Sequence, residues 1–208
     1  MTTVAETTAG KGNRTRADAR RNRERIVAAA REVFVAHGPD APLDEVARRA
    51  GIGNATLYRH FPDRDALVHE VVRSVLVRTV DHAESAAQET DAFTALCRFA
   101  HAAADEGIGA VCGMLVGGDD RRAGEPHALG RRLERAVDAL MERAGRSGQV
   151  RPGVTTDDLV VAMSRLTRPL PGAASCPGPD EAAHRHLQLL LDGLRPPATS
   201  VPSTPAAP

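Results

Sequence analysis

Residues 43–61 read LDEVARRAGIGNATLYRHF, which is two short helix-like runs on either side of a glycine-containing turn. Pro42 suits the first turn of a helix, and the two acidic residues after the first leucine suit the positive end of a helix. Gly51 can adopt the left-handed conformation that ends a helix and turns the chain sharply. We therefore predict helices over residues 43–50 and 54–60, joined as a helix-turn-helix.

The second of these helices has an apolar side and a polar side. Leu57 and Phe61 are four residues apart, so they face the same way, toward a core that includes Val46. The major groove of a duplex admits one helix of a pair while the other crosses the backbone. The residues left for outward use on the second helix are Asn54, Ala55, Thr56, Tyr58, Arg59 and His60.

Supporting helices flank the motif on both sides. Upstream, apolar residues recur at helical spacing from Ile26 to Phe34, and the pattern ends before Gly38. Downstream, Pro62 cannot continue a helix and Asp63 can cap the next one, which keeps a wide apolar face beyond residue 80. The motif is thus predicted to lie between two helices that hold it in place.

The rest of the chain is also predicted to be helical. Aromatic residues make up only 2% of the chain, so alanine, valine and leucine must build the core, and no alternating strand pattern competes. The fold class is therefore all-α. Further helices are expected over residues 92–104, 108–116, 126–146, 156–166 and 180–194.

Charge and cysteine usage narrow the class of protein. The first 62 residues hold 11 basic and 7 acidic residues, against 16 and 20 in the remainder, an asymmetry expected when one end meets nucleic acid. The three cysteines form no CxxC pair, so neither a disulfide framework nor a zinc site is indicated. No apolar leader or run of 18 apolar residues is present. We expect a cytoplasmic protein with no membrane partner.

The run LDEVARRAGIGNATLYRHFPDRDALVHEV, with the preceding RERIVAAAREVFVAHG, resembles the N-terminal domain of the TetR family of transcriptional regulators. The features that carry the resemblance are FxxxG at the end of the first helix, AGI at the turn, and TLYRHF before a fourth helix. It implies an N-terminal three-helix helix-turn-helix DNA-binding domain, joined by a long fourth helix to an α-helical ligand-binding and dimerisation domain.

The resemblance also sets the domain bounds. The DNA-binding domain is expected at residues 19–79, with the helix-turn-helix motif at 41–60, and the effector-binding and dimerisation domain at 80–195. Residues 1–18 and 196–208 lack the apolar surface to offset chain ordering, so a disordered basic arm and a disordered tail are expected there.

Carried over residue by residue, the resemblance implies the DNA contacts. Base or groove contacts are assigned to Asn54, Ala55 and Thr56, because amide and hydroxyl groups read base edges. Phosphate contacts are assigned to Tyr58 and His60, and Arg59 can serve either purpose. The other residues of the predicted DNA-binding set are Arg25, Arg48 and Gly53.

Two residues depart from the family pattern. Many members have serine or threonine where Pro42 stands, and serine is frequent where Gly53 stands. Neither residue offers a hydroxyl. Asn54 is therefore expected either to read a base or to cap its own helix.

For the C-terminal part, the resemblance implies an effector pocket and a homodimer. Soft or mildly polar groups on apolar helices suit a pocket wall, although each could instead be plain core. The expected lining residues are Phe93, Cys97, His101, Cys112, Met114 and Met163. The last two helices are expected to pair with those of a second copy. Their expected interface residues are Leu159, Met163, Leu166, Leu187, Leu190, Leu191 and Leu194.

Metal and catalytic sites find no support in the sequence. HEVVR begins like a zinc-protease HExxH motif, but Arg73 takes the place of the second ligand. His184 and His186 are two residues apart, which on a helix turns them about 200° from each other. We predict no metal, no cofactor and no catalytic group.

The function predicted from the sequence is a ligand-responsive transcriptional regulator. It is expected to act as a repressor, binding a near-palindromic double-stranded DNA operator as a homodimer and responding to a small-molecule effector. A helical ligand-binding protein without specific DNA binding stays open, because of Pro42 and Gly53. An all-α enzyme is the other alternative.

Overall fold

A computed structural model describes residues 6–116, 124–168 and 179–197. Within these ranges the chain is helical, with no strand, as predicted for an all-α protein. None of the helices in these ranges is both long and apolar enough to cross a membrane. The helices are α1 (Glu6–His37), α2 (Leu43–Ala50), α3 (Asn54–His60), α4 (Arg64–Ala86), α5 (Ala92–Asp105), α6 (Ile108–Val116), α7 (Glu125–Arg146), α8 (Thr156–Leu166) and α9 (Pro179–Gly193).

The turn between α2 and α3 has the predicted geometry. Gly51 has φ 66° and ψ 38°, the left-handed conformation that a residue without a Cβ adopts at low cost. Its N–H donates to the carbonyl of Arg48 at 3.1 Å, and the N–H of Ile52 donates to Ala47 at 3.0 Å. These bonds satisfy the last carbonyls of α2 while the chain reverses into α3.

A small core holds the N-terminal domain together. Leu57 and Phe61 are 0% and 1% exposed and pack with Val46, as the sequence pattern predicts. Ile26 and Phe34 bring α1 into the same cluster. Burying a leucine or phenylalanine side chain contributes about 2 kcal/mol each, so α3 is held on one face and presents the other to solvent.

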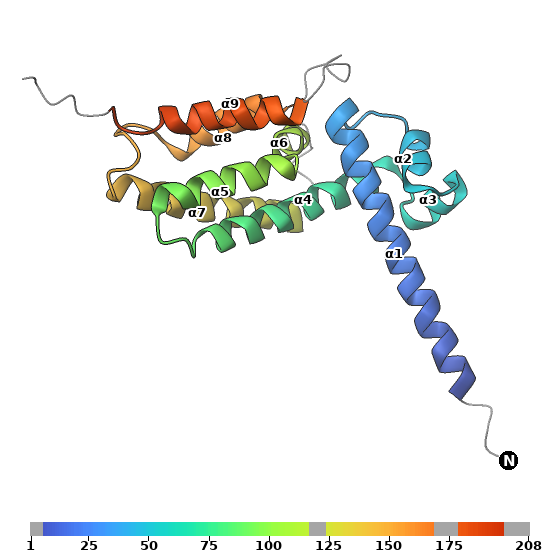
Figure 1. The fold of residues 1–208 in the computed structure, drawn as a ribbon. Coiled ribbons are helices and arrows are strands. Elements are labelled where there is room, and N and C mark those ends of the chain that lie inside the picture. The colour runs from blue at the N-terminus through green and yellow to red at the C-terminus, as the bar shows by residue number, and fades with distance from the viewer. Residues whose placement is uncertain (1–5, 117–123, 169–178, 198–208) are drawn as a thin grey trace, which may run out of the picture.

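The start of α1 differs from the disordered arm expected over residues 1–18. The backbone is helical from Glu6 onward, whereas residues 1–5 lie outside the described ranges. Alanine, glutamate and arginine are good helix formers, and adding residues to an existing helix needs no new nucleus. Extension from the packed segment of α1 accounts for the difference. Figure 1 shows this part of α1 projecting away from the other helices.

Helix α4 joins the two halves of the molecule (Figure 1). It starts at the predicted cap, where the Asp63 carboxylate accepts a hydrogen bond from the N–H of Ala66 at 2.7 Å. Leu67 and Val71 belong to the N-terminal core, while Val75 and Leu76 belong to the C-terminal core. A single helix therefore contributes to both domains.

The C-terminal domain packs in two groups of helices. Helices α4, α5 and α7 contact one another, and α8 and α9 lie together, with α9 against α5 (Figure 1). Phe93 and Phe99 are the aromatic residues of its core, and aliphatic side chains from all these helices fill the remainder. This is the aromatic-poor core that the composition predicts.

Candidate nucleic-acid interface and effector site

The outer face of α3 carries the predicted DNA-contacting residues. Tyr58 is 50% exposed, and its hydroxyl makes no hydrogen bond to any described residue. Gly53, Asn54, Ala55 and Arg59 are exposed, and Thr56 and His60 are half-buried. Only Leu57 of this helix is buried. The core thus fixes one side of this short helix, and the opposite side exposes polar side chains to solvent.

Asn54 neither caps α3 nor stands free. Gly53 is the N-cap residue and offers no side chain, so its carbonyl alone accepts from the N–H groups of Thr56 and Leu57. The Asn54 amide instead donates to the Asp44 carboxylate at 2.8 Å, a bond from α3 to α2. One N–H and the amide oxygen of Asn54 stay available to a ligand.

Arg59 is held along α3 by its neighbour. Its guanidinium donates to the hydroxyl of Thr56 at 3.1 Å, one turn earlier on the same helix. Both side chains are therefore partly oriented before any ligand arrives. Arginine and threonine so placed suit contacts to guanine or to phosphate.

Arg25 and Arg48 have partners within the protein. Arg25 donates to the carbonyl of Ala50 at 2.6 Å, where it satisfies the C-terminal end of α2. Arg48 pairs with Glu45 at 2.5 Å and is 73% exposed. Pro42, at the N-cap of α2, provides no side-chain hydrogen bond. Arg25 thus has a structural task besides any DNA contact.

Two arginines that hold parts of the N-terminal domain together were not predicted from the sequence pattern. Arg23 lies over the Phe61 ring at 4.3 Å and pairs with Glu70 of α4 at 3.0 Å. Arg64 donates to the carbonyls of Pro39 and Ala41 at 2.7 and 2.6 Å. Because partners 23 to 47 residues apart give no local signal, sequence periodicity could not have found them.

Glu70 is the anion of this cluster. Burial raises the pKa of its carboxyl, but hydrogen bonds and charges from Arg73 and Arg23 outweigh burial, so the pKa lies below its usual value. Arg73, which replaces the second ligand of an HExxH motif, donates to Glu70 at 2.7 Å. The HEVVR sequence therefore forms a structural ion pair.

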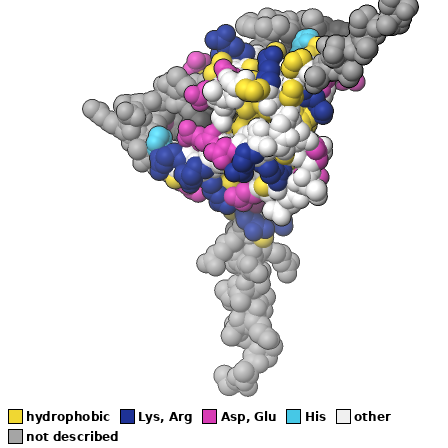
Figure 2. Space-filling view, turned by 90° about the vertical axis from the view of Figure 1, so that its left-hand side faces the viewer, with side chains coloured by type: hydrophobic (Ala, Val, Ile, Leu, Met, Phe, Trp, Pro, Cys, Tyr) yellow, Lys and Arg dark blue, Asp and Glu magenta, His cyan; other side chains and the backbone are white. Residues whose placement is uncertain are grey.

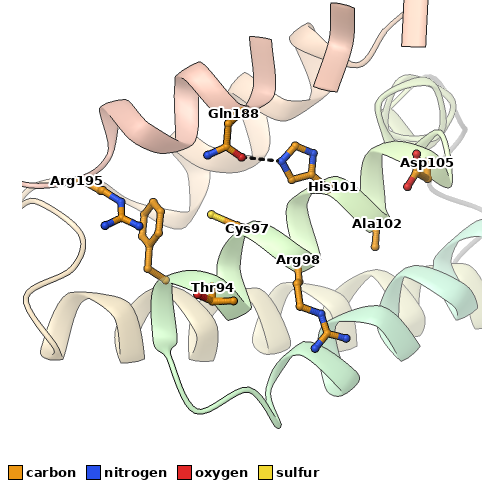
Figure 3. A pocket seen from close by; sticks show the side chains of 9 residues that line it. Thr94, Cys97, Arg98, His101, Ala102, Asp105, Gln188 and Arg195 are labelled. Atoms are coloured by element: carbon orange, nitrogen blue, oxygen red, sulfur yellow. Dashed lines mark hydrogen bonds between the residues drawn. The ribbon is translucent and has the colours of Figure 1, made fainter. Parts of the chain in front are cut away.

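A cleft of about 470 Å³ opens on the C-terminal domain between α5 and α9. Three of the six residues expected to line the effector pocket lie here: Phe93, Cys97 and His101. Figure 3 shows His101 directed toward Gln188 of α9, and Arg195 at the other end of the cleft. The Arg195 guanidinium stacks on the Phe93 ring at 4.0 Å.

The other three expected pocket residues do not line this cleft. Met163 is 4% exposed and packs in the core, which is the alternative that the sequence left open for each of these residues. Met114 is half-buried and packs against both hydrophobic cores. The side chain of Cys112 lies outside the described part of the structure. Apolar core residues and pocket residues share one sequence pattern, so the prediction could not separate them.

A hydrogen-bonded chain crosses the cleft. The Nδ1 atoms of His101 and His184 are 2.8 Å apart. The two imidazole rings are stacked, with their centroids 5.1 Å apart. His101 Nε2 lies 3.0 Å from Oε1 of the Gln188 side-chain amide, and His184 Nε2 lies 2.8 Å from Oδ1 of the Asp105 carboxylate. Among the described residues, no three His, Cys, Asp or Glu side chains are arranged to hold a metal ion. This row of hydrogen-bonded side chains thus joins α5 to α9.

The predicted dimer face needs correction. Leu159, Leu187 and Leu191 are at most 1% exposed, and Met163 and Leu194 are at most 5% exposed. All five pack in the core of this chain, so a second copy cannot cover them. Leu166 and Leu190 are half-buried. The apolar side chains that α8 and α9 do expose are Val160, Val161 and Leu189, at 39%, 51% and 65%.

Figure 2 looks onto the end of the C-terminal domain opposite the helix-turn-helix. Acidic and basic side chains are interspersed there around a group of hydrophobic ones (Figure 2). No stretch of a single sign of charge covers this face of the described residues. The charges at this end are mixed in sign, whereas a surface that binds a polyanion is predominantly positive.

Comparisons with known proteins identify the family to which the chain belongs. Residues 26–71 match the model for bacterial regulatory proteins of the TetR family, and residues 90–196 match the model for the C-terminal domain of SbtR-like transcriptional regulators. Over 62 residues the chain is 45% identical to the HTH-type transcriptional regulator TtgW of Pseudomonas putida. That match spans 29% of this chain and 46% of TtgW, less than half of the relative's length.

Two solved structures extend the similarity to most of the chain. The TetR regulator SCO0520 from Streptomyces coelicolor is 32% identical, with a TM-score of 0.57 over 85% of this chain and 99% of that one. A TetR regulatory protein from Mycobacterium vanbaalenii is also 32% identical, with a TM-score of 0.53 over 88% and 99%. The chain therefore belongs to the TetR family of helix-turn-helix transcriptional regulators, which are not enzymes, and it has an SbtR-like C-terminal domain.

Proposed function

We propose that this protein is a homodimeric repressor that binds a near-palindromic operator and releases it when a small molecule binds the C-terminal domain. The observation that carries the proposal is the outer face of α3. Leu57 and Phe61 fix the helix from the core side, while Tyr58 and Arg59 present unburied polar groups on the other. A rigid helix with free donors is what entry into a major groove requires.

The donors on α3 divide into two tasks. The Tyr58 hydroxyl has no partner among the described residues, so it is free to donate to a phosphate and set the register of the helix. Arg59, oriented by Thr56, reaches a base edge or a phosphate. Asn54 keeps one N–H and its carbonyl oxygen for an adenine edge while Asp44 holds the other N–H.

Dimerisation would use the outer faces of α8 and α9. Val160, Val161 and Leu189 are large apolar side chains left exposed by a single chain, and a two-fold partner would cover them. A closed dimer would place its two recognition helices about one turn of DNA apart, roughly 34–36 Å. An operator with two related half-sites follows from that symmetry.

The effector would bind in the cleft between α5 and α9. A cleft of about 470 Å³ lies within the range of small-molecule sites, and Phe93 and Cys97 give it an apolar wall beside the polar groups of His101 and Gln188. A ligand that prefers one arrangement of the dimer shifts its population away from the DNA-binding one.

Titration against duplex DNA from the protein's own promoter region tests the proposal. We expect saturable binding that is stronger than binding to a shuffled duplex of the same length. The affinity should fall steeply as salt rises, because basic side chains displace counterions from the phosphates. Equal affinity for both duplexes would favour a ligand-binding protein without specific DNA recognition.

A further inference from the structure

The carboxylate of Glu106, the residue after α5, lies between cations of two other helices. Its side chain is 14% exposed. One carboxylate oxygen, Oε2, accepts a hydrogen bond from Arg31 of α1 at 2.6 Å. The same oxygen lies 2.8 Å from Arg78 Nε of α4, and Oε1 lies 3.5 Å from His82 Nε2. Three basic groups thus converge on one acid.

The Arg31 contact links the two domains. Arg31 lies between residues of α1 that form the N-terminal core, such as Ala30 and Val33, and that core holds α2 and α3. Glu106 ends a helix of the C-terminal domain, 75 residues later in the chain. A movement of Glu106 is therefore passed to α1 directly, in addition to the path through α4.

Gly107 follows Glu106 in the turn between α5 and α6 and packs closely against α1. Gly107 has φ 74°, and a Cβ there would lie 2.7 Å from Cγ2 of Val35. The Gly107 backbone and the Val35 side chain are in close contact. The turn therefore cannot shift without moving α1 or losing its contact with α1. The Glu106 contact is thus supported by close packing.

The preceding residue faces the cleft. Asp105 accepts from His184 of α9 at 2.8 Å and lines the cleft between α5 and α9. Asp105 and Glu106 are adjacent in sequence. Asp105 contacts α9, while Glu106 contacts α1 and α4. A ligand that separates His184 from Asp105 acts one residue away from the interdomain contact.

We propose that Glu106 is a positioning residue that couples the α5–α9 cleft to the DNA-binding domain. This proposal rests on the proposed function, because it takes the cleft as the effector site. A ligand that displaces His184 rotates the last turn of α5, and Glu106 then draws Arg31 and the attached helix-turn-helix with it. The DNA-binding domain leaves its operator-binding orientation as a result.

The electrostatics make this contact sensitive to small shifts. The pKa of Arg78 is lowered, mainly by burial and further by the positive charge of Arg31. The negative charge of Glu106 raises this pKa and so opposes both effects. Arg78 Nε is buried and, despite its 2.8 Å approach, is not aligned to donate a hydrogen bond to Glu106. Without the carboxylate, Arg31 and Arg78 would face each other as uncompensated cations, and repulsion would push α1 away.

The first test compares Glu106→Gln with Glu84→Gln. Glu84 pairs with Arg132 at 2.6 Å inside the C-terminal domain, so its substitution removes an ion pair that does not cross between domains. We expect E106Q to weaken binding to the promoter duplex at least tenfold and to speed amide hydrogen exchange over residues 26–37. E84Q should change neither. Equal effects of the two variants on both measurements would overturn the proposal.

The second test asks whether the cleft acts through Glu106. His184→Ala removes the contact to Asp105 and imitates its displacement by a ligand. It should weaken DNA binding several-fold in the wild-type background and have little further effect in E106Q. The same loss in both backgrounds would show that Glu106 is not the coupling residue. If E106Q does not fold, E106D, which keeps the charge but shortens the side chain, takes its place.

These measurements separate the two proposals. If the wild-type protein binds no DNA selectively, the proposed function fails. Hydrogen exchange of α1 then still decides whether Glu106 and His184 are coupled: faster exchange in H184A than in wild type, with no further increase when H184A is added to E106Q, supports the link. Exchange in α1 that is unaffected by either substitution contradicts it.

Discussion

The Asn54 amide donates to the Asp44 carboxylate at 2.8 Å, which ties the start of α3 to α2. Both residues are exposed, on the side of the motif proposed to face DNA. The bond fixes the direction of the Asn54 side chain before DNA arrives. It also places a negative charge close to where phosphates would lie.

Substitution of Asp44 should therefore strengthen DNA binding. Asp44→Asn keeps an acceptor for Asn54 but removes the charge, so we expect about fivefold tighter binding at low salt. The free energy of unfolding should fall by about 0.3–1 kcal/mol, because an acid in the first turn of α2 favours the helix dipole. Fluorescence anisotropy and chemical denaturation would measure the two effects.

Asp44→Ala distinguishes the two roles of the carboxylate. Like Asp44→Asn it removes the charge, but it also releases the Asn54 amide. If Asn54 reads a base, only the alanine variant should change the preferred sequence near that contact. Identical sequence preferences for both variants would remove Asn54 from the set of base-reading residues.

Gly107→Ala should destabilise the joint between the domains. The positive φ and the 2.7 Å approach to Val35 both oppose a methyl group, and we expect a loss of about 1–3 kcal/mol in the free energy of unfolding. Combining it with Val35→Ala relieves the contact but not the backbone strain. A double variant no more stable than G107A would show that contact with Val35 is unimportant.

Acid should weaken the start of α5. Hydrogen bonds from Thr94, and then from Gln149, lower the pKa of Asp91 from 3.8 to about 2. A lowered pKa stabilises the fold fully above pH 3.8, and the contribution is lost as pH falls toward 2. Asp91→Ala should therefore reduce Tm at pH 7, and the difference from wild type should shrink below pH 3.8. A difference independent of pH would contradict this assignment.

Val161→Glu should disrupt the proposed dimer. Val161 is 51% exposed, so the single chain should fold normally, while a charge would be buried in the pair. We expect half the mass in light scattering and an operator affinity lower by on the order of 100-fold, because two linked half-sites no longer bind together. Leu187→Ala is the control: it should cost about 2–5 kcal/mol of stability without this selective effect.

Local signals predicted most helix boundaries of the described chain. Gly51 and the Pro62–Asp63 pair act within a few residues of themselves, so their effects could be predicted from the sequence. The faces of α8 and α9 could not, because an apolar stripe such as Leu187, Leu191 and Leu194 looks the same in a core and in an interface.

Contacts between distant residues were equally hidden from the sequence. Asn54 could have read a base or capped its helix, and its bond to Asp44 depends on the angle between α2 and α3. Arg31 and Glu106, 75 residues apart in the chain, meet only because the fold brings the residue after α5 next to α1. Tertiary geometry decides such contacts, and charge and spacing along the chain do not reveal it.

Selection from a pool of randomised duplexes shows whether α3 reads DNA sequence, because the pool contains every candidate half-site and no operator sequence has to be chosen. We expect enrichment of an inverted repeat with half-sites about one turn of DNA apart. Tyr58→Phe should bind that sequence roughly fivefold to tenfold more weakly with unchanged Tm, because only one hydrogen bond to a phosphate is lost. A pool that stays random after repeated rounds would contradict the assignment of α3 as a sequence-reading helix.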